Sequence, residues 1–279
     1  PGSRAARNRN VGLNENLARE ILELHTLGVD GGYTQADVTA LARIITGWSF
    51  VGAGERLGPA GSFVFVANRH EPGEQLLLGK RYSDTGVEQG ETALRDIARH
   101  PSTATHVARK LVRHFISADA PPPALIEQLA KVFRDTDGDL AEVSRALVGH
   151  PDALKGEAAN IRQPWEWVAA IGRFAGAPKD VGQILQPLNL LGQPLWAPPG
   201  PNGWPDSPAH WGSPEGMRTR LDLAATAARR IGDRFNPSEL ADQLFDTALS
   251  AETAQAIRRA ESKQQGLAML MMAPEFLRR

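Results

Sequence analysis

The sequence predicts an all-α fold, a multi-helix domain with one small inserted β-hairpin. Three observations lead to this prediction. Most segments repeat apolar residues at the three- and four-residue spacing of an amphipathic helix, several of them begin at a capping residue, and β-prone runs occur only around residues 62–79. Of the 279 residues, 42% are hydrophobic and 23% are charged, a composition that is typical of globular proteins.

The boundaries of the first two helices are predicted from residues that stop or cap a helix. The first is predicted from Leu13 to Leu27, and Gly28 stops it. Thr34 caps the second helix, and Asp37 three residues later completes a variant of the capping box. We therefore expect two short helices joined by the turn that precedes Thr34.

A hairpin and a longer series of helices follow. The β-prone run 62–66 and the apolar run 75–78 are expected to pair across a turn at 68–73. Asp139 is predicted to cap one of the later helices. These helices are expected at 88–99, 102–116, 122–134, 139–149, 163–175, 180–191, 215–231, 237–248 and 251–271.

Four parts are predicted along the chain. Residues 1–12 are predicted to form an N-terminal linker, or the trimmed end of a longer precursor, because they are small and basic and no apolar segment of a signal peptide follows them. Residues 13–191 form the main helical domain, with the hairpin at about 62–79. Residues 192–213 form a strap rich in proline and tryptophan. Residues 214–279 form a C-terminal helical subdomain packed on the main domain, so one compact domain is expected, with 192–213 as an alternative hinge.

Composition excludes some classes of function. The net charge is −1, so no global field attracts nucleic acid or an anionic membrane. The absence of cysteine excludes disulfides, thiolate nucleophiles and zinc bound by cysteine. The longest apolar run, Leu267 to Ala273, is far too short to span a bilayer.

A series of short tracts matches the pattern of one protein family. The tracts are 14–20, 23–28, 31–38, 46–48, 70–73, 78–79, 100–104, 109–111, 114–115, 136–140, 192–194, 198–199, 201–205 and Trp211. Together, and in this order, they resemble the bacterial domain-of-unknown-function family 1800 over nearly the whole chain. The resemblance implies a mostly helical protein that corresponds to the C-terminal portion of the family, with a further helical segment upstream.

The same resemblance implies a cellular location and a partner, but no catalytic activity. Members of the family are typically bacterial, are commonly exported to the periplasm or the extracellular space, and are often encoded beside a sulfatase-like protein. The partner implied is therefore that protein or the upstream segment of the family. The resemblance carries over no catalytic residue, and neither a metal nor a cofactor can be named.

Four residues are candidates for catalysis by carboxylates and histidine. Glu20 and Glu23 lie on the polar arc of the first helix, where carboxylates offer an acid/base pair or ligands for a hard cation. His70 and Glu71 lie side by side in a turn, where binding groups often occur. The alternative is structural, because the helix arc could be solvated or salt-bridged and the turn could be only a turn.

Four further residues are candidates for ligand binding. Arg109 and Lys110 lie on the basic arc of helix 102–116, which could hold an anion, dock on the acidic arc of the first helix, or face water. Trp204 and Trp211 belong to the proline- and tryptophan-rich strap, which could form a wall for a sugar, peptide or aromatic ligand. The strap could equally be a stiff cover over the core.

Two hypotheses of function follow. The first is a binding or assembly component of an exported or envelope protein complex, and it is favoured because the sequence has no nucleophile, dinucleotide or zinc motif. The alternative is a hydrolase or a metal-dependent enzyme with a carboxylate/histidine site. That alternative requires the candidate catalytic residues to converge in one cleft.

Overall fold

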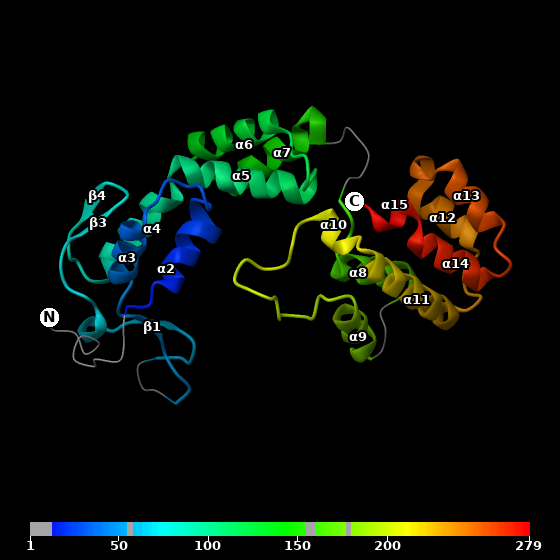
Figure 1. The fold of residues 1–279 in the computed structure, drawn as a ribbon, viewed down its shortest axis with the longest axis horizontal. Helices are drawn as coiled ribbons and strands as arrows, with labels where there is room; N and C mark the ends of the chain where they lie inside the picture. The colour runs from blue at the N-terminus through cyan, green and yellow to red at the C-terminus, as the bar shows by residue number, and fades with distance from the viewer. Residues whose placement is uncertain (1–12, 55–57, 154–159, 177–179) are drawn as a thin grey trace. The chain divides into compact units, whose positions relative to one another are not determined.

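The computed structural model describes residues 13–54, 58–153, 160–176 and 180–279 (Figure 1). The predicted linker 1–12 lies outside these ranges. Helices make up most of the described chain, and the strands form two sheets of two strands each. The prediction of an all-α fold with a small β element is therefore confirmed.

Contacts between residues group the chain into two compact units. Unit 1 contains Pro1–Lys110 and Pro123–His150, and unit 2 contains Leu111–Pro122 and Pro151–Arg279. The chain passes between the units three times: within the helix α5 (Pro101–Phe115), between Pro122 and Pro123, and between His150 and Pro151. The boundaries expected at residues 191 and 213 stay predictions.

Unit 1 begins with a helix that changes its winding. The helix α2 (Asn16–Glu20) continues directly into a π-helix, η1 (Ile21–Thr26), where a single α-helix was predicted. The hydroxyl of Thr26 donates to the carbonyl of Ile21 at 2.6 Å, five residues earlier, which matches the wider turn. The helix ends at Gly28, whose φ of +86° is a left-handed conformation that glycine adopts without strain.

The other helices of unit 1 follow the predicted ones closely. Thr34 and Asp37 form the expected capping box at the start of α3. Asp139 accepts hydrogen bonds from the N–H groups of Ala141 and Glu142, as an N-cap does. The helices are α3 (Gln35–Ile44), α4 (Val87–Ala98), the first part of α5, α6 (Pro123–Asp135) and α7 (Leu140–Gly149), with a 3-10 turn, η2 (Ala67–Arg69).

The strands pair differently from the single hairpin that the sequence predicts. Strand β1 (Trp48–Phe50) pairs with β2 (Phe63–Phe65), and β3 (Gln75–Leu77) pairs with β4 (Lys80–Tyr82), both antiparallel. The reason is the two-residue turn at Leu78 and Gly79, whose φ angles of +50° and +77° suit a tight hairpin. That turn gives β3 a partner directly after it.

One carboxylate fixes this second hairpin on helix α3. Oδ2 of Asp37 accepts from the N–H and the hydroxyl of Thr34, at 2.8 and 2.7 Å. Its Oδ1 accepts from the N–H of Leu78 at 2.7 Å. Burial raises the pKa of Asp37, but these hydrogen bonds outweigh it and leave the pKa below its ordinary value. The capping residue therefore also holds the strained Leu78 turn.

Unit 2 is built almost entirely of helices around its own core. The largest fully buried side chains in this core include Trp167, Leu267 and Leu270. The helix predicted at 251–271 is divided in two, because Ser262 caps a new helix there. The helices are α8 (Pro164–Ala175), α9 (Gly182–Leu190), α10 (Pro208–Trp211), α11 (Pro214–Ile231), α12 (Pro237–Phe245), α13 (Ala251–Arg258), α14 (Lys263–Met272) and α15 (Pro274–Leu277), with 3-10 turns η3 (Pro151–Ala153) and η4 (Asp246–Ala248).

A short backbone pairing joins distant parts of unit 2. Asn160 and Arg279 exchange two backbone hydrogen bonds, of 3.2 and 2.9 Å, and Ile161 forms an antiparallel bridge with Arg278. The N–H of Arg162 donates to the carbonyl of Leu277 at 2.7 Å. Residues 160–162 are thereby held beside 277–279, just before α8 begins.

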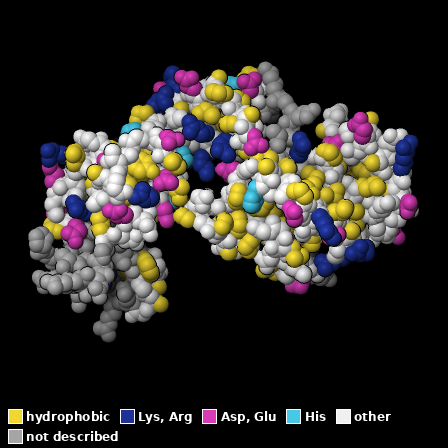
Figure 2. Space-filling view, viewed as in Figure 1, with side chains coloured by type: hydrophobic (Ala, Val, Ile, Leu, Met, Phe, Trp, Pro, Cys, Tyr) yellow, Lys and Arg dark blue, Asp and Glu magenta, His cyan; other side chains and the backbone are white. Residues whose placement is uncertain are grey.

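The surface carries both signs of charge. Figure 2 shows lysine and arginine interspersed with aspartate and glutamate over the visible face, in agreement with the net charge of −1. Within the described ranges, no helix is both long enough and apolar enough to cross a membrane.

Candidate functional site

The predicted catalytic histidine, His70, is buried in unit 1 and helps to hold two segments together. His70 is 8% exposed, and its Nδ1 lies 2.9 Å from the carbonyl oxygen of Thr46, to which it donates. Its Nε2 lies 3.6 Å from Oδ1 of Asp84. The N–H of the neighbouring Glu71 donates to the hydroxyl of Thr46 at 2.7 Å. The turn that carries His70 and Glu71 is therefore tied to the end of α3 through Thr46.

The two predicted catalytic glutamates lie on another element. Glu20 is the half-buried last residue of α2, and Glu23 in η1 accepts a hydrogen bond from the hydroxyl of Tyr33 at 3.1 Å. In the described part of the chain, no hydrogen bond joins Glu20 or Glu23 to His70. Their proposed catalytic role stays a prediction.

The described residues also contain no group of three or more histidine, aspartate or glutamate side chains that is arranged to hold a metal ion.

The predicted basic arc lies on α5, with Arg109 and Lys110 both exposed. A contact from α5 to the first helix is made by His106, whose Nε2 lies 3.0 Å from the carbonyl of Leu24. Burial lowers the pKa of His106, and its hydrogen bond to that carbonyl opposes the shift. The lowered pKa favours the neutral form of His106 in this contact.

The tryptophans of the strap have different environments. Trp211 is 4% exposed, and its indole N–H donates to the carbonyl of Pro205 at 2.8 Å. Trp204 is half-buried, with its ring centroid 6.5 Å from that of Trp211. Trp196 is 92% exposed. The polar atom of Trp211 is thus engaged within the strap, and the ligand-binding role predicted for Trp204 and Trp211 stays a prediction.

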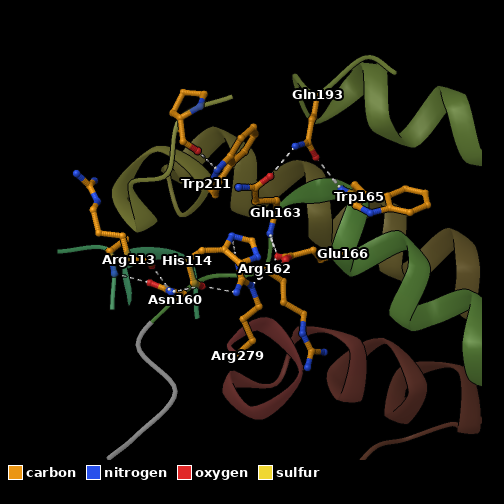
Figure 3. A network of polar contacts seen from close by, with 12 residues as sticks. Arg113, His114, Asn160, Arg162, Gln163, Trp165, Glu166, Gln193, Trp211 and Arg279 are labelled. Atoms are coloured by element: carbon orange, nitrogen blue, oxygen red, sulfur yellow. Dashed lines mark hydrogen bonds and ion pairs between the residues drawn. The ribbon is translucent and has the colours of Figure 1, made fainter. Parts of the chain in front are cut away.

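A network of polar contacts surrounds the start of α8 (Figure 3). Oε1 of Gln193 accepts from the N–H of Trp165, and its Nε2 donates to Oε1 of Gln163, both at 2.8 Å. Oε2 of Glu166 accepts from the N–H of Gln163 at 2.9 Å. Two of the free N–H groups at this helix end are therefore satisfied by side chains.

Asn160 is the centre of the second part of the network. Its Oδ1 accepts from the N–H of Ala118 at 2.9 Å, and its Nδ2 donates to the carbonyls of Arg113 and His114, each at 3.0 Å. The guanidinium of Arg279 donates to the carbonyl of His114 at 2.6 Å and pairs with Glu166 at 2.8 Å. These contacts, visible in Figure 3, hold the end of α5 within unit 2.

A buried arginine lies close to this network. Arg220 on α11 is 1% exposed, donates to the carbonyl of Arg162 at 2.7 Å, and stacks 5.4 Å from the ring centre of Trp167. Burial lowers its pKa to about 10, so it stays protonated at neutral pH. Among the described residues, its Nε and Nη1 have no hydrogen-bond partner, and they have almost no accessible surface. Because the protein itself covers these atoms, the aromatic face of Trp167 is their main stabilising contact.

A groove also borders α8. It consists of two adjoining cavities, of about 770 and 340 Å³, that lie among α8, α9 and α11. Both cavities touch Val168, Ile171, Gln183, Ala227 and Arg230, so they form one continuous depression. The larger cavity is also lined by Trp165, Ala169, Gly172, Arg173, Ala175, Gly176, Ile184, Ile231 and Arg234, and the smaller by Trp167, Gln186, Pro187, Leu190, Leu223 and Thr226.

The charged residues of the groove all have the same sign. Arg173, Arg230 and Arg234 line it, and no aspartate or glutamate is among the described lining residues. Arg234 is fixed by hydrogen bonds to the carbonyls of Ala175 and Ile231, at 3.0 and 3.1 Å. Arg173 and Arg230 are exposed and have no acidic partner in the described part of the chain. The groove therefore combines apolar walls with a cationic rim.

Sequence reasoning missed this groove, although a signal for it exists. Trp165, Trp167, Val168, Ile171 and Phe174 surround α8 with apolar side chains on more than one face. Only one of these faces is needed for the core of unit 2, so another is left without a covering element. The basic rim carries no such signal, because Arg173, Arg230 and Arg234 are spaced irregularly along the sequence.

Comparison with known proteins gives one positive result. The model of the family described as a protein of unknown function, DUF1800, matches residues 3–278. No curated protein and no solved structure matches the chain. Because the match covers nearly all of its length, this chain belongs to the DUF1800 family.

Proposed function

We propose that this protein is a non-catalytic binding component of a protein complex, and that unit 2 holds the partner in the groove among α8, α9 and α11. The observation that carries the proposal is the groove itself, which is open and apolar and has a volume of about 770 Å³ in its larger part. Apolar surface of this kind costs free energy while it faces water, and a partner that covers it recovers that cost.

Exposed side chains beside the groove extend the apolar surface. Trp165 on the groove wall is 54% exposed, and Leu190 at the end of α9 is 58% exposed. These exposed apolar side chains support a partner larger than a small molecule, because a small ligand would leave much of the surface bare.

The proposed setting follows the family resemblance. We expect a bacterial protein exported to the periplasm or the extracellular space, in an envelope or secreted complex. The expected partner is the sulfatase-like protein or the upstream segment of the family. A nucleic-acid partner is not expected, because the net charge is −1 and both signs are mixed on the visible face.

The enzyme hypothesis has less support from the arrangement of its residues. His70 is buried and bonded to Thr46, and Glu23 is bonded to Tyr33. A catalytic acid or base must reach the substrate, so burial at 8% exposure counts against His70 in this role.

The experiment is to purify the untagged protein from its native host and to analyse it by native mass spectrometry and elemental analysis. A co-purifying protein chain without a bound metal is the expected result. A lone chain that carries a stoichiometric metal or small ligand would refute the proposal and would support the enzyme hypothesis. In that event His70, Glu20 and Glu23 are the first positions to mutate.

A further inference from the structure

The charge of the groove restricts what can occupy it. Three arginines line it without a carboxylate among the described lining residues, although acidic and basic residues are almost equal in number over the whole chain, 32 and 31. Arg173 and Arg230 have no acidic partner among the described residues, so their positive charge is available to a bound molecule. A ligand with positive charges would be repelled here, and one with carboxylates would gain charge-assisted hydrogen bonds.

The shape of the groove restricts the occupant further. Two adjoining cavities share the side chains of Val168, Ile171 and Ala227, so apolar side chains spaced along one stripe of a partner could enter both. Both cavities are partly open to solvent, and Trp165 on the wall of the larger one is half exposed. An acyl chain or another small amphiphile needs a more enclosed site, whereas a helix laid along an open groove buries one face and leaves the other in water.

We propose that the groove among α8, α9 and α11 binds an acidic amphipathic helix of a partner protein, with its apolar stripe in the two cavities and its carboxylates on Arg173 and Arg230. This inference rests on the proposed function and specifies the class of partner segment. Arg234, held by the carbonyls of Ala175 and Ile231, keeps positive charge near the end of α8 and adds to the same field.

Gly172 provides a direct way to block the groove. It lies inside α8 on the groove wall, and a Cβ atom added there would meet no heavy atom within 4 Å. Gly172→Leu therefore adds a large side chain at the groove wall, with a Cβ that meets no neighbouring atom, and it improves helix propensity. Gly172→Ala is the matched control, since it makes the same backbone change and leaves the groove almost empty.

The test uses the full chain and two synthetic fluorescent peptides of about 18 residues, both with a leucine stripe at helical spacing. One peptide carries glutamates beside the stripe and the other carries lysines at the same positions. Binding is measured by fluorescence anisotropy at low and high salt. We expect the glutamate peptide to bind at least about tenfold more tightly than the lysine peptide, and the difference to shrink at high salt.

The variants make the result specific to the groove. Gly172→Leu is expected to weaken binding of the glutamate peptide by about tenfold or more, and Gly172→Ala by less than about threefold. Arg230→Glu is expected to weaken the glutamate peptide and to strengthen the lysine peptide. Equal binding of both peptides, binding unchanged by Gly172→Leu, or displacement of the peptide by dodecanoate at an equal concentration would each overturn the inference.

The inference and the proposed function fail in different ways. If the wild-type protein and the Gly172→Leu variant retain the same partner from the native host, the complex exists and the groove inference is wrong. If neither retains a partner, the proposed function is wrong. Loss of the partner from Gly172→Leu alone, with Gly172→Ala as wild type, supports both.

Discussion

Replacing Asn160 with alanine tests how unit 2 holds the end of α5. The side chain is 4% exposed and makes three hydrogen bonds, one accepted from the N–H of Ala118 and two donated to the carbonyls of Arg113 and His114. The N–H of Ser117 bonds to the carbonyl of Val112, so the carbonyl of Arg113 depends on Asn160. Asn160→Ala would remove all three of these hydrogen bonds at once.

The expected cost follows from the groups left unpaired. The carbonyl of His114 keeps its bond from Arg279, at 2.6 Å, and contributes little to the loss. The N–H of Ala118 and the carbonyl of Arg113 lose the partners described above, and a buried unpaired group costs about 1–3 kcal/mol. We therefore expect Asn160→Ala to lower the free energy of unfolding of unit 2 by about 3 kcal/mol.

Tryptophan fluorescence in a urea titration is the appropriate assay. Of the six tryptophans, only Trp48 lies in unit 1, so the emission reports mainly on unit 2. The midpoint should fall by about 1–2 M urea, given the usual dependence of stability on denaturant. Asn189→Ala, at an exposed position of α9, is the control and should stay within about 0.5 kcal/mol of wild type. A loss below about 1 kcal/mol for Asn160→Ala would refute the reasoning.

Three further predictions concern both units. Hydrogen bonds lower the pKa of Asp37 in the folded state, so the stability that its carboxylate contributes is present at neutral pH and is lost as the pH falls below about 4. The difference in hydrogen exchange of α3 between wild type and Asp37→Asn should therefore shrink over that range. Gly90→Ala should lower the melting temperature of unit 1, because a Cβ there would lie 2.5 Å from the ring of Trp48, whereas Gly149→Ala, with no atom within 4 Å, should not; circular dichroism measures both. Leu270→Ala should cost unit 2 about 2–5 kcal/mol in the urea titration, since the side chain is fully buried, and a loss under about 1 kcal/mol would contradict the assigned core.

Local sequence signals predicted the helices well because their causes are local. The capping box of Thr34 and Asp37 and the cap at Asp139 are formed by residues within three positions of one another. The hairpins were harder, because their pairing depends on competition between segments. The left-handed turn at Leu78 and Gly79 decided it, and leucine is a rare residue in that conformation.

The candidate site could be predicted much less completely. The groove is formed by α8, α9 and α11, which are separated in sequence and brought together only by the core of unit 2. Several tracts of the family resemblance contain residues whose hydrogen bonds hold two segments of one unit together. Gln193 caps α8, the Nδ1 of His100 accepts the N–H of Ser102 at the start of α5, and Thr46 holds the turn of His70. Short polar motifs thus indicated fixed contacts within each unit, which sequence alone does not distinguish from functional sites.

The pairing of residues 160–162 with 277–279 sets an order of events during synthesis. Every residue of unit 1 precedes residue 151, so unit 1 can fold while the rest of the chain is still being made. Unit 2 cannot close until its last paired residues have left the ribosome. Until then, the segment Leu111–Pro122 lacks the Asn160 contacts that hold it in the folded unit. This early-made segment is therefore the part of unit 2 that stays exposed longest to chaperones and proteases.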